Sequence, residues 1–196
     1  MNAIRNILAI VVGVLAIVVG VGGYVKMAPM IAAFNEFDDE AYRTYSEMVV
    51  SLLATGNPAE ATVWKAKVAE DVTFEDVEES IDSISVERNI RGVGKLPPSE
   101  QVELMTGTKQ PIVKIYQFCN PLTAMRMLEF SLAYSAYLPC RIAVVEDKDK
   151  QLWLYTLNMD MMIHGGKPLP PALREEALGV KDIMLDILNR GAAGEF

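Results

Sequence analysis

The chain has 196 residues, of which 51% are hydrophobic and 22% are charged, and its formal net charge is −8 at pH 7. The length suits one domain with a normal core. A protein that binds nucleic acid needs a basic face to neutralise phosphates, so this acidic composition argues against nucleic acid as a partner.

An uncharged apolar run extends from Ile7 to Val25 near the start of the chain. As an α-helix it would span roughly 28 Å, close to the ~30 Å hydrocarbon core of a bilayer. A secretory signal usually has a shorter apolar stretch that ends at a small-residue cleavage site, whereas this run is followed by Lys26 to Pro29. We therefore predict that residues 1–28 are a membrane anchor that is retained, with a cleaved signal peptide as the alternative.

Basic residues flank the apolar run on both sides, with Arg5 before it and Lys26 and Arg43 after it. Basic residues near a membrane helix favour the inner side. We predict a short inner tail and an exported domain, which corresponds to a single-pass protein of a bacterial cell inner membrane with a periplasmic domain.

Small residues recur within the apolar run at steps of four and three, at Ala9, Gly13, Ala16, Gly20 and Gly23. Small residues let helix backbones approach closely in lipid. The same spacing continues outside the apolar run with the bulkier residues Met27, Met30, Phe34 and Phe37, and then with Ala41. This pattern predicts helix association, either in a homo-oligomer or with other membrane protein subunits. The alternative is that Gly and Ala are simply common in membrane helices.

Residues 29–58 are predicted to form a juxtamembrane helix. Apolar residues from Ile31 to Leu52 recur at helical spacing, and Gly56-Asn57-Pro58 ends the pattern after Thr55. We expect this helix to continue the membrane helix, although Pro29 removes a backbone hydrogen bond. Alternatively, it packs only on its own domain.

The remaining residues, 59–196, are predicted to form an α+β domain. Residues 61–69 alternate as a half-buried strand does. Thr73 and Asp76 predict a capping box at the start of a helix with a buried stripe. Further strands are expected at Ile90–Leu96, Gln101–Thr106, Ile112–Phe118, Arg141–Glu146 and Leu152–Asn158. The last two flank a polar hairpin turn at 147–150.

Two more helices complete this domain. Pro121 is expected to begin a helix that continues to about Tyr137, because proline is tolerated at the first helical position. A final helix is expected from about Pro171 to Asn189, ending at Gly191.

Several short motifs follow one another between Tyr116 and Thr156. Asn120-Pro121 follows an apolar strand, Leu138-Pro139-Cys140-Arg141 follows a helix, and a pair of strands with a Glu-Asp turn comes next. In this order and spacing the chain resembles the family named domain of unknown function 302, over roughly residues 61–160. The resemblance implies a β-α-β-β-β-β-α fold with helices packed on one face of a mainly antiparallel sheet, and it implies no activity.

Four residues in these motifs, Cys119, Asn120, Cys140 and Arg141, are candidates for the lining of a ligand groove. The alternative is structural, with Asn120 capping a helix and Arg141 pairing with a carboxylate. A helix of about 16 residues between the two cysteines would hold them roughly 24 Å apart, which is too far for a disulfide. We therefore expect both to be free and to pack as small hydrophobic residues.

The only histidine, His164, lies in a methionine-rich segment that begins at Met159. In an extended strand, Met162 and His164 would share a face with Asp160, and such side chains can bind a soft or borderline metal ion such as copper. Met162 and His164 are therefore candidate metal ligands. The alternative is that the methionines fill a core and that the histidine only forms a hydrogen bond.

No enzyme motif is recognisable: there is no G-x-S-x-G, and the glycines between Arg91 and Lys95 lack the spacing of a nucleotide-binding loop and suggest a strand with a bulge. The leading hypothesis is a non-enzymatic, membrane-anchored accessory protein or subunit of a membrane protein complex. The alternative is a metal, haem or small-ligand binding protein that uses a groove near Cys119, Cys140 and His164. The sequence identifies no particular cofactor.

Overall fold

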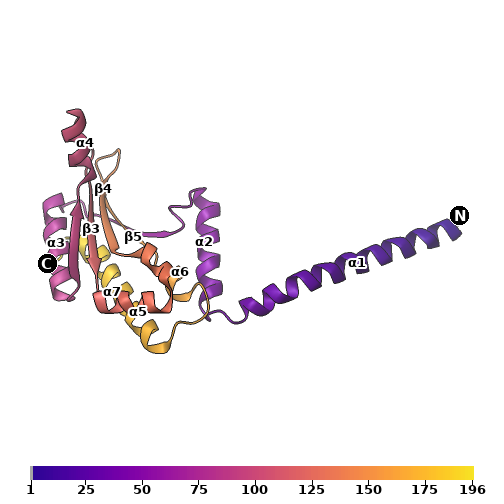
Figure 1. The fold of residues 1–196 in the computed structure, drawn as a ribbon. Coiled ribbons are helices and arrows are strands. Elements are labelled where there is room, and N and C mark those ends of the chain that lie inside the picture. The colour runs from indigo at the N-terminus through magenta and orange to yellow at the C-terminus, as the bar shows by residue number, and fades with distance from the viewer. Residues whose placement is uncertain (1) are drawn as a thin grey trace.

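The computed structural model describes residues 2–196, which form a long N-terminal helix and a domain of strands and helices (Figure 1). The helices are α1 (Asn2–Phe34), α2 (Ala41–Thr55), α3 (Phe74–Glu87), α4 (Pro98–Thr106), α5 (Pro121–Phe130), α6 (Asp160–His164) and α7 (Pro171–Ala193), with a 3-10 helix, η1, at Leu132–Tyr137. The strands are β1 (Val63–Lys67), β2 (Arg91–Leu96), β3 (Val113–Cys119), β4 (Cys140–Glu146) and β5 (Leu152–Leu157).

The strands form one sheet in the order β1-β5-β4-β3-β2, in which every pair of neighbours is antiparallel. This confirms the prediction of an α+β fold. The predicted hairpin joins β4 to β5, and its turn is closed by Asp147, whose carboxylate accepts a hydrogen bond from the indole N–H of Trp153 at 2.8 Å. The predicted bulge in β2 lies between Gly92 and Gly94.

The core lies between one face of the sheet and the helices α3 and α7, which contact each other and the strands. Alternate residues of the central strands point toward these helices and are buried, namely Tyr116, Phe118, Ile142, Val144 and Leu154. The predicted capping box begins α3: Thr73 Oγ1 accepts a hydrogen bond from the Asp76 amide at 3.2 Å, and the Asp76 carboxylate accepts one from the Thr73 amide at 2.8 Å.

Helix α1 extends away from the domain (Figure 1). Within Arg5–Phe34, an 18-residue window has a mean hydropathy of 2.6, and no part of this apolar window is buried. This length and composition make α1 a candidate membrane span, although a signal sequence near the N-terminus has the same properties. Pro29 lies inside α1 without ending it.

The predicted continuous helix from Ile31 to Thr55 is wrong, because the chain leaves the helical path between α1 and α2. Asp38 lies in this break, and its backbone N–H donates a hydrogen bond at 2.8 Å to the carbonyl of Gly166, far along the chain. Phe37 and Ala41 therefore do not extend the helical spacing of the apolar segment in α1.

The expected strand Gln101–Thr106 is also wrong, because these residues belong to α4. Pro98 occupies the first turn of this helix, and Gly107 ends it with a φ of 70°. Helix α4 lies at the far end of the β2–β3 hairpin, where Figure 1 shows it projecting from the domain, and none of its residues is buried. A short apolar run fits the strand and helix periods equally well, so these two caps were the better signal.

Two helices end at residues other than those predicted. The helix beginning at Pro121 ends at Phe130, because Ser131 is extended with a φ of −157°, and η1 follows. Helix α7 continues through Gly191 to a left-handed Gly194. A Cβ at Gly191 would lie 3.2 Å from Leu154 Cδ2, so this glycine permits close helix–sheet packing and does not end the helix.

Candidate functional site

The two cysteines lie on neighbouring strands at the same end of the sheet. Cys119 is the last residue of β3, Cys140 is the first of β4, and the register pairs Phe118 with Cys140. The expected separation of roughly 24 Å was therefore wrong, because the chain between the strands folds back instead of forming one straight helix. Both cysteines are free.

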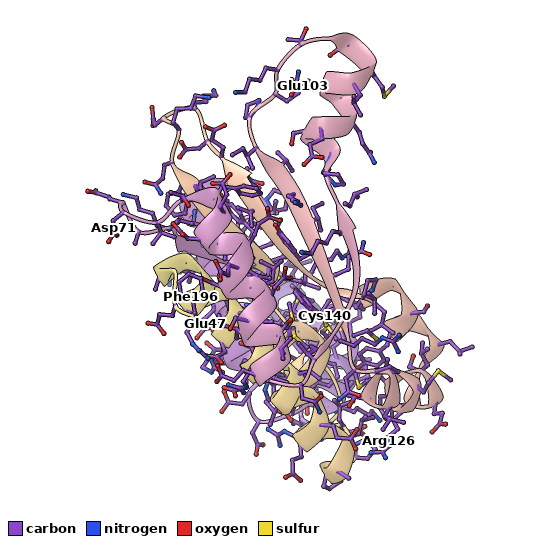
Figure 2. All side chains as sticks on the ribbon, turned by 90° about the vertical axis from the view of Figure 1, so that its left-hand side faces the viewer. Glu47, Asp71, Glu103, Arg126, Cys140 and Phe196 are labelled. Atoms are coloured by element: carbon purple, nitrogen blue, oxygen red, sulfur yellow. The ribbon has the colours of Figure 1, made fainter. Side chains whose placement is uncertain are left out.

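Both cysteines line a small cavity together with Met127, Met159 and Met162, and we call it the sulfur cavity. Its volume is about 40 Å³, and most of the remaining lining is apolar, including Leu138. Cys140 is half-buried, and Figure 2 labels it near the lower ends of the strands. Burial, followed by the proximity of Cys119, raises the pKa of the Cys140 thiol to about 11.

Asn120 caps α5, as the structural interpretation predicts, because its side-chain oxygen accepts a hydrogen bond from the Thr123 amide at 3.3 Å. Both residues also line the sulfur cavity. The Thr123 hydroxyl donates at 3.1 Å to Glu176, which also forms an ion pair with Arg126. The polar groups beside the sulfur cavity are therefore already engaged in helix capping and in a contact with α7.

Arg141 is exposed, and its Nε donates a hydrogen bond at 3.3 Å to the Pro139 carbonyl. It lines a second, larger pocket of about 300 Å³, which we call the open-face pocket because residues such as Ala143 and Tyr155 line it from the sheet face opposite the core. The open-face pocket and the sulfur cavity share three lining residues: Cys140, Met159 and Met162. Three of the four predicted groove residues thus contribute to the sulfur cavity, and Arg141 borders the neighbouring pocket.

The candidate metal ligands Met162 and His164 have different surroundings. The segment expected to be extended forms the short helix α6, which begins where the Asn158 side chain accepts a hydrogen bond from the Asp160 amide at 2.8 Å. Asp160 forms an ion pair with Lys181. Met162 lines the sulfur cavity, whereas His164 is 5% exposed and contacts Asp38. Among the residues that the structure describes, no group of three or more His, Cys, Asp or Glu side chains is arranged to hold a metal ion.

Asp38 is a functional candidate that sequence reasoning missed. It is 4% exposed, and its Oδ1 lies 3.0 Å from Nδ1 of His164. Arg174 of α7 lies on its other side, with Nη2 3.4 Å from Oδ2. Burial alone would raise the pKa of the Asp38 carboxyl, but the Glu40 amide, His164 and Arg174 outweigh burial and keep this pKa below its usual value.

The contacts around Asp38 attach the segment between α1 and α2 to the loop that follows α6. We call this set of contacts the linker joint. Besides the Asp38–His164 and Asp38–Gly166 contacts, Tyr45 Oη donates to the Gly165 carbonyl at 2.5 Å, and Glu36 pairs with Lys167. No local pattern marks Asp38, because it lies in an acidic stretch that resembles a solvated turn.

Comparisons with known proteins agree with this architecture. Residues 64–191 match the sequence profile described as "Domain of unknown function DUF302". Among solved structures, the fold is similar to that of an uncharacterized conserved DUF302 protein from Bacillus stearothermophilus, with a TM-score of 0.52 and 18% sequence identity, covering 65% of this chain and 95% of that chain. A comparison with curated proteins gives no match. Since the family profile matches more than half of its length, the chain belongs to the DUF302 family, which the resemblance in its sequence implied.

Proposed function

We propose that this protein is a single-pass, membrane-anchored accessory protein, or a subunit of a membrane protein complex, and that it is not an enzyme. In this account α1 crosses the inner membrane and the DUF302 domain is exported to the periplasm. The observation that carries the proposal is that Arg5–Phe34 is strongly apolar and that its apolar window is wholly unburied. Apolar area of this extent is stable in lipid or against other apolar helices, and unfavourable in water.

The surface of α2 supports the same account. In Figure 1, α2 lies on the side of the domain from which α1 extends. Its second half exposes apolar side chains: Val50 is 66% and Leu53 is 80% exposed. Exposed apolar residues on this helix suit contact with lipid or with another membrane subunit.

The linker joint would determine how the domain sits relative to the anchor. A free linker would let the domain turn independently of α1, whereas the buried Asp38 ties the linker to the loop that follows α6. An accessory protein that must present one face to a membrane partner benefits from such a fixed connection.

The stripe of small residues in α1 is the proposed contact surface within the membrane. A Cβ added at Gly13 or Gly20 would meet no atom within 4 Å, so this side of the helix is open to a partner. Leucine at both positions would hold a second helix further away.

Purification of the full chain from membranes in mild detergent tests this function. We expect the unaltered chain to purify as an oligomer or with other membrane subunits, and the Gly13→Leu/Gly20→Leu variant to lose this association. Gly22→Leu is the matched control, because Gly22 is equally open but lies outside the stripe. A monomer without partners, whose behaviour neither change alters, would contradict the proposal.

Two features of the domain support a non-enzymatic role. The single histidine is only 5% exposed, so it offers little surface from which to act as a general base on a bound substrate. The Cys140 thiol has a pKa raised to about 11, which keeps it protonated near neutral pH, whereas reactive cysteines need the thiolate.

A second candidate function is the binding of a small ligand in the open-face pocket. Its volume of about 300 Å³ and its apolar lining suit a small apolar molecule, and Arg141 would favour one that carries a negative charge. Native mass spectrometry of the purified protein checks this alternative: a bound small molecule that Arg141→Ala removes would support it, and an empty pocket under gentle isolation would count against it.

A further inference from the structure

We propose that Cys119, Cys140, Met159 and Met162 form a binding site for a single Cu(I) ion. This inference rests on the sulfur cavity alone and does not depend on membrane anchoring. It also replaces the ligand pair Met162 and His164, because the structure directs His164 to Asp38 and brings the cysteines to Met162 instead.

The residues that line the sulfur cavity are rich in sulfur, which suits a soft metal ion. Two cysteines and three methionines line one cavity: Cys119 at the end of β3, Cys140 at the start of β4, Met127 of α5, and Met159 and Met162 in the α6 region. Thiolate and thioether sulfurs are soft ligands, and soft ligands select Cu(I) over hard cations such as Mg²⁺ and Ca²⁺. Cu(I) would displace the thiol protons of the cysteines when it binds, and these protons would be released to solvent. Among the residues lining the sulfur cavity there is no carboxylate to compete for the ion.

The proposed sulfur ligands belong to parts of the chain that are already ordered before any ion binds. The register of β3 and β4 pairs Phe118 with Cys140, so the backbones of Cys119 and Cys140 are held close together at the end of the sheet where both residues line the cavity. Met159 is buried and belongs to the main core cluster, against which Met162 packs. Ligands on strands and on packed segments lose little freedom when they bind an ion, which raises affinity.

The volume of the sulfur cavity and its position beside the open-face pocket also suit a single ion. A cavity of about 40 Å³ has room for an ion or a water-sized species, and not for haem. The open-face pocket shares Cys140, Met159 and Met162 with it, so the two cavities adjoin and an ion would approach the sulfur ligands from this side. The apolar remainder of the lining would keep water away from the bound Cu(I).

A competition titration tests the site. The full chain in mild detergent, reduced and free of oxygen, is titrated with Cu(I) in the presence of bathocuproine disulfonate, which absorbs visible light when it takes the ion. We expect one Cu(I) per chain for the unaltered protein and none for the Cys119→Ser/Cys140→Ser variant. X-ray absorption of the loaded protein should show sulfur neighbours around copper and no histidine signature.

Two methionine variants distinguish the loss of a copper ligand from the loss of the fold. Met159→Leu conserves side-chain volume, so the fold should survive while affinity for Cu(I) falls about tenfold or more. Met125→Leu is the control, because Met125 is exposed on α5 and does not line the cavity, and it should bind as the unaltered chain does. The site is overturned if the unaltered chain leaves all copper with the competitor, or if Met159→Leu binds as tightly as Met125→Leu.

Discussion

At the scale of single residues, Asp38 is the group through which the N-terminal segment is held against the domain. Its carboxylate is buried between His164 and Arg174, and its amide is bonded to Gly166. A carboxylate only accepts hydrogen bonds, so the proton of the His164 ring lies on Nδ1 in this contact. Removing the carboxylate leaves both partners without their acceptor.

We expect Asp38→Ala to lower the stability of the domain by roughly 1–3 kcal/mol, because a buried hydrogen-bond partner is lost. The linker joint should open, so residues 35–40 should become sensitive to limited proteolysis. Asp39→Ala is the matched control, since Asp39 is exposed and adjacent. Equal thermal unfolding and equal cleavage of the two variants would show that the joint does not depend on Asp38.

Glu78 is a second informative acidic residue, located on α3. Its Oε1 accepts a hydrogen bond from the Tyr116 hydroxyl at 2.5 Å and pairs with Lys114 Nζ at 2.6 Å. Burial alone would raise the pKa of the Glu78 carboxyl, but Lys114 and Tyr116 outweigh burial and lower this pKa below its usual value. Burial and the same contact with Glu78 raise the pKa of the Tyr116 phenol.

A carboxyl whose pKa is lower in the folded state stabilises the fold above its unfolded pKa, near 4.3 for Glu, and this stabilisation is lost as the pH falls through the folded pKa. We therefore expect Glu78→Gln to be less stable than the unaltered chain at about pH 7, by roughly 1–2 kcal/mol. The difference should shrink at pH values below about 4. Glu103→Gln on the exposed α4 is the control, and thermal unfolding at several pH values is the measurement; a pH-independent difference would contradict the assignment.

At the scale of elements, α4 and β5 differ in whether their apolar side chains are exposed or buried. Leu104 is 87% exposed at the far end of the β2–β3 hairpin, whereas Leu154 of β5 is fully buried in the core. We expect Leu104→Ala to change stability by less than about 0.5 kcal/mol and Leu154→Ala to cost about 2–5 kcal/mol. Thermal melts of the two variants compare them directly, and a large loss for Leu104→Ala would mean that α4 packs on the domain.

Some elements can be predicted from local sequence patterns, and others depend on contacts between residues far apart in the sequence. The strands around Val144 and Leu154 and the capping box at Thr73 follow from local patterns, and the structure confirms them. The break at Asp38 could not be predicted, because its cause is a hydrogen bond to Gly166, far away in sequence. The proximity of the two cysteines depends on strand register in the same way, and register is a property of the assembled sheet.

At the scale of the whole molecule, the proposed account joins a membrane helix, a fixed linker and a DUF302 domain into one unit. The domain supplies two further surfaces, the exposed second half of α2 and the tip formed by α4. Membership of the DUF302 family describes the domain and says nothing about the helix, because the family match begins at residue 64. The anchor is therefore the part of the account on which the others depend.

The most direct test is the mass and location of the mature protein expressed in a bacterial cell. Membranes are washed with alkaline carbonate, which releases peripheral proteins, and the chain is measured by intact mass spectrometry. The account predicts that the chain stays in the membrane pellet with α1 still attached. A soluble periplasmic chain whose mass shows that α1 has been removed would contradict it, because α1 would then be a signal peptide.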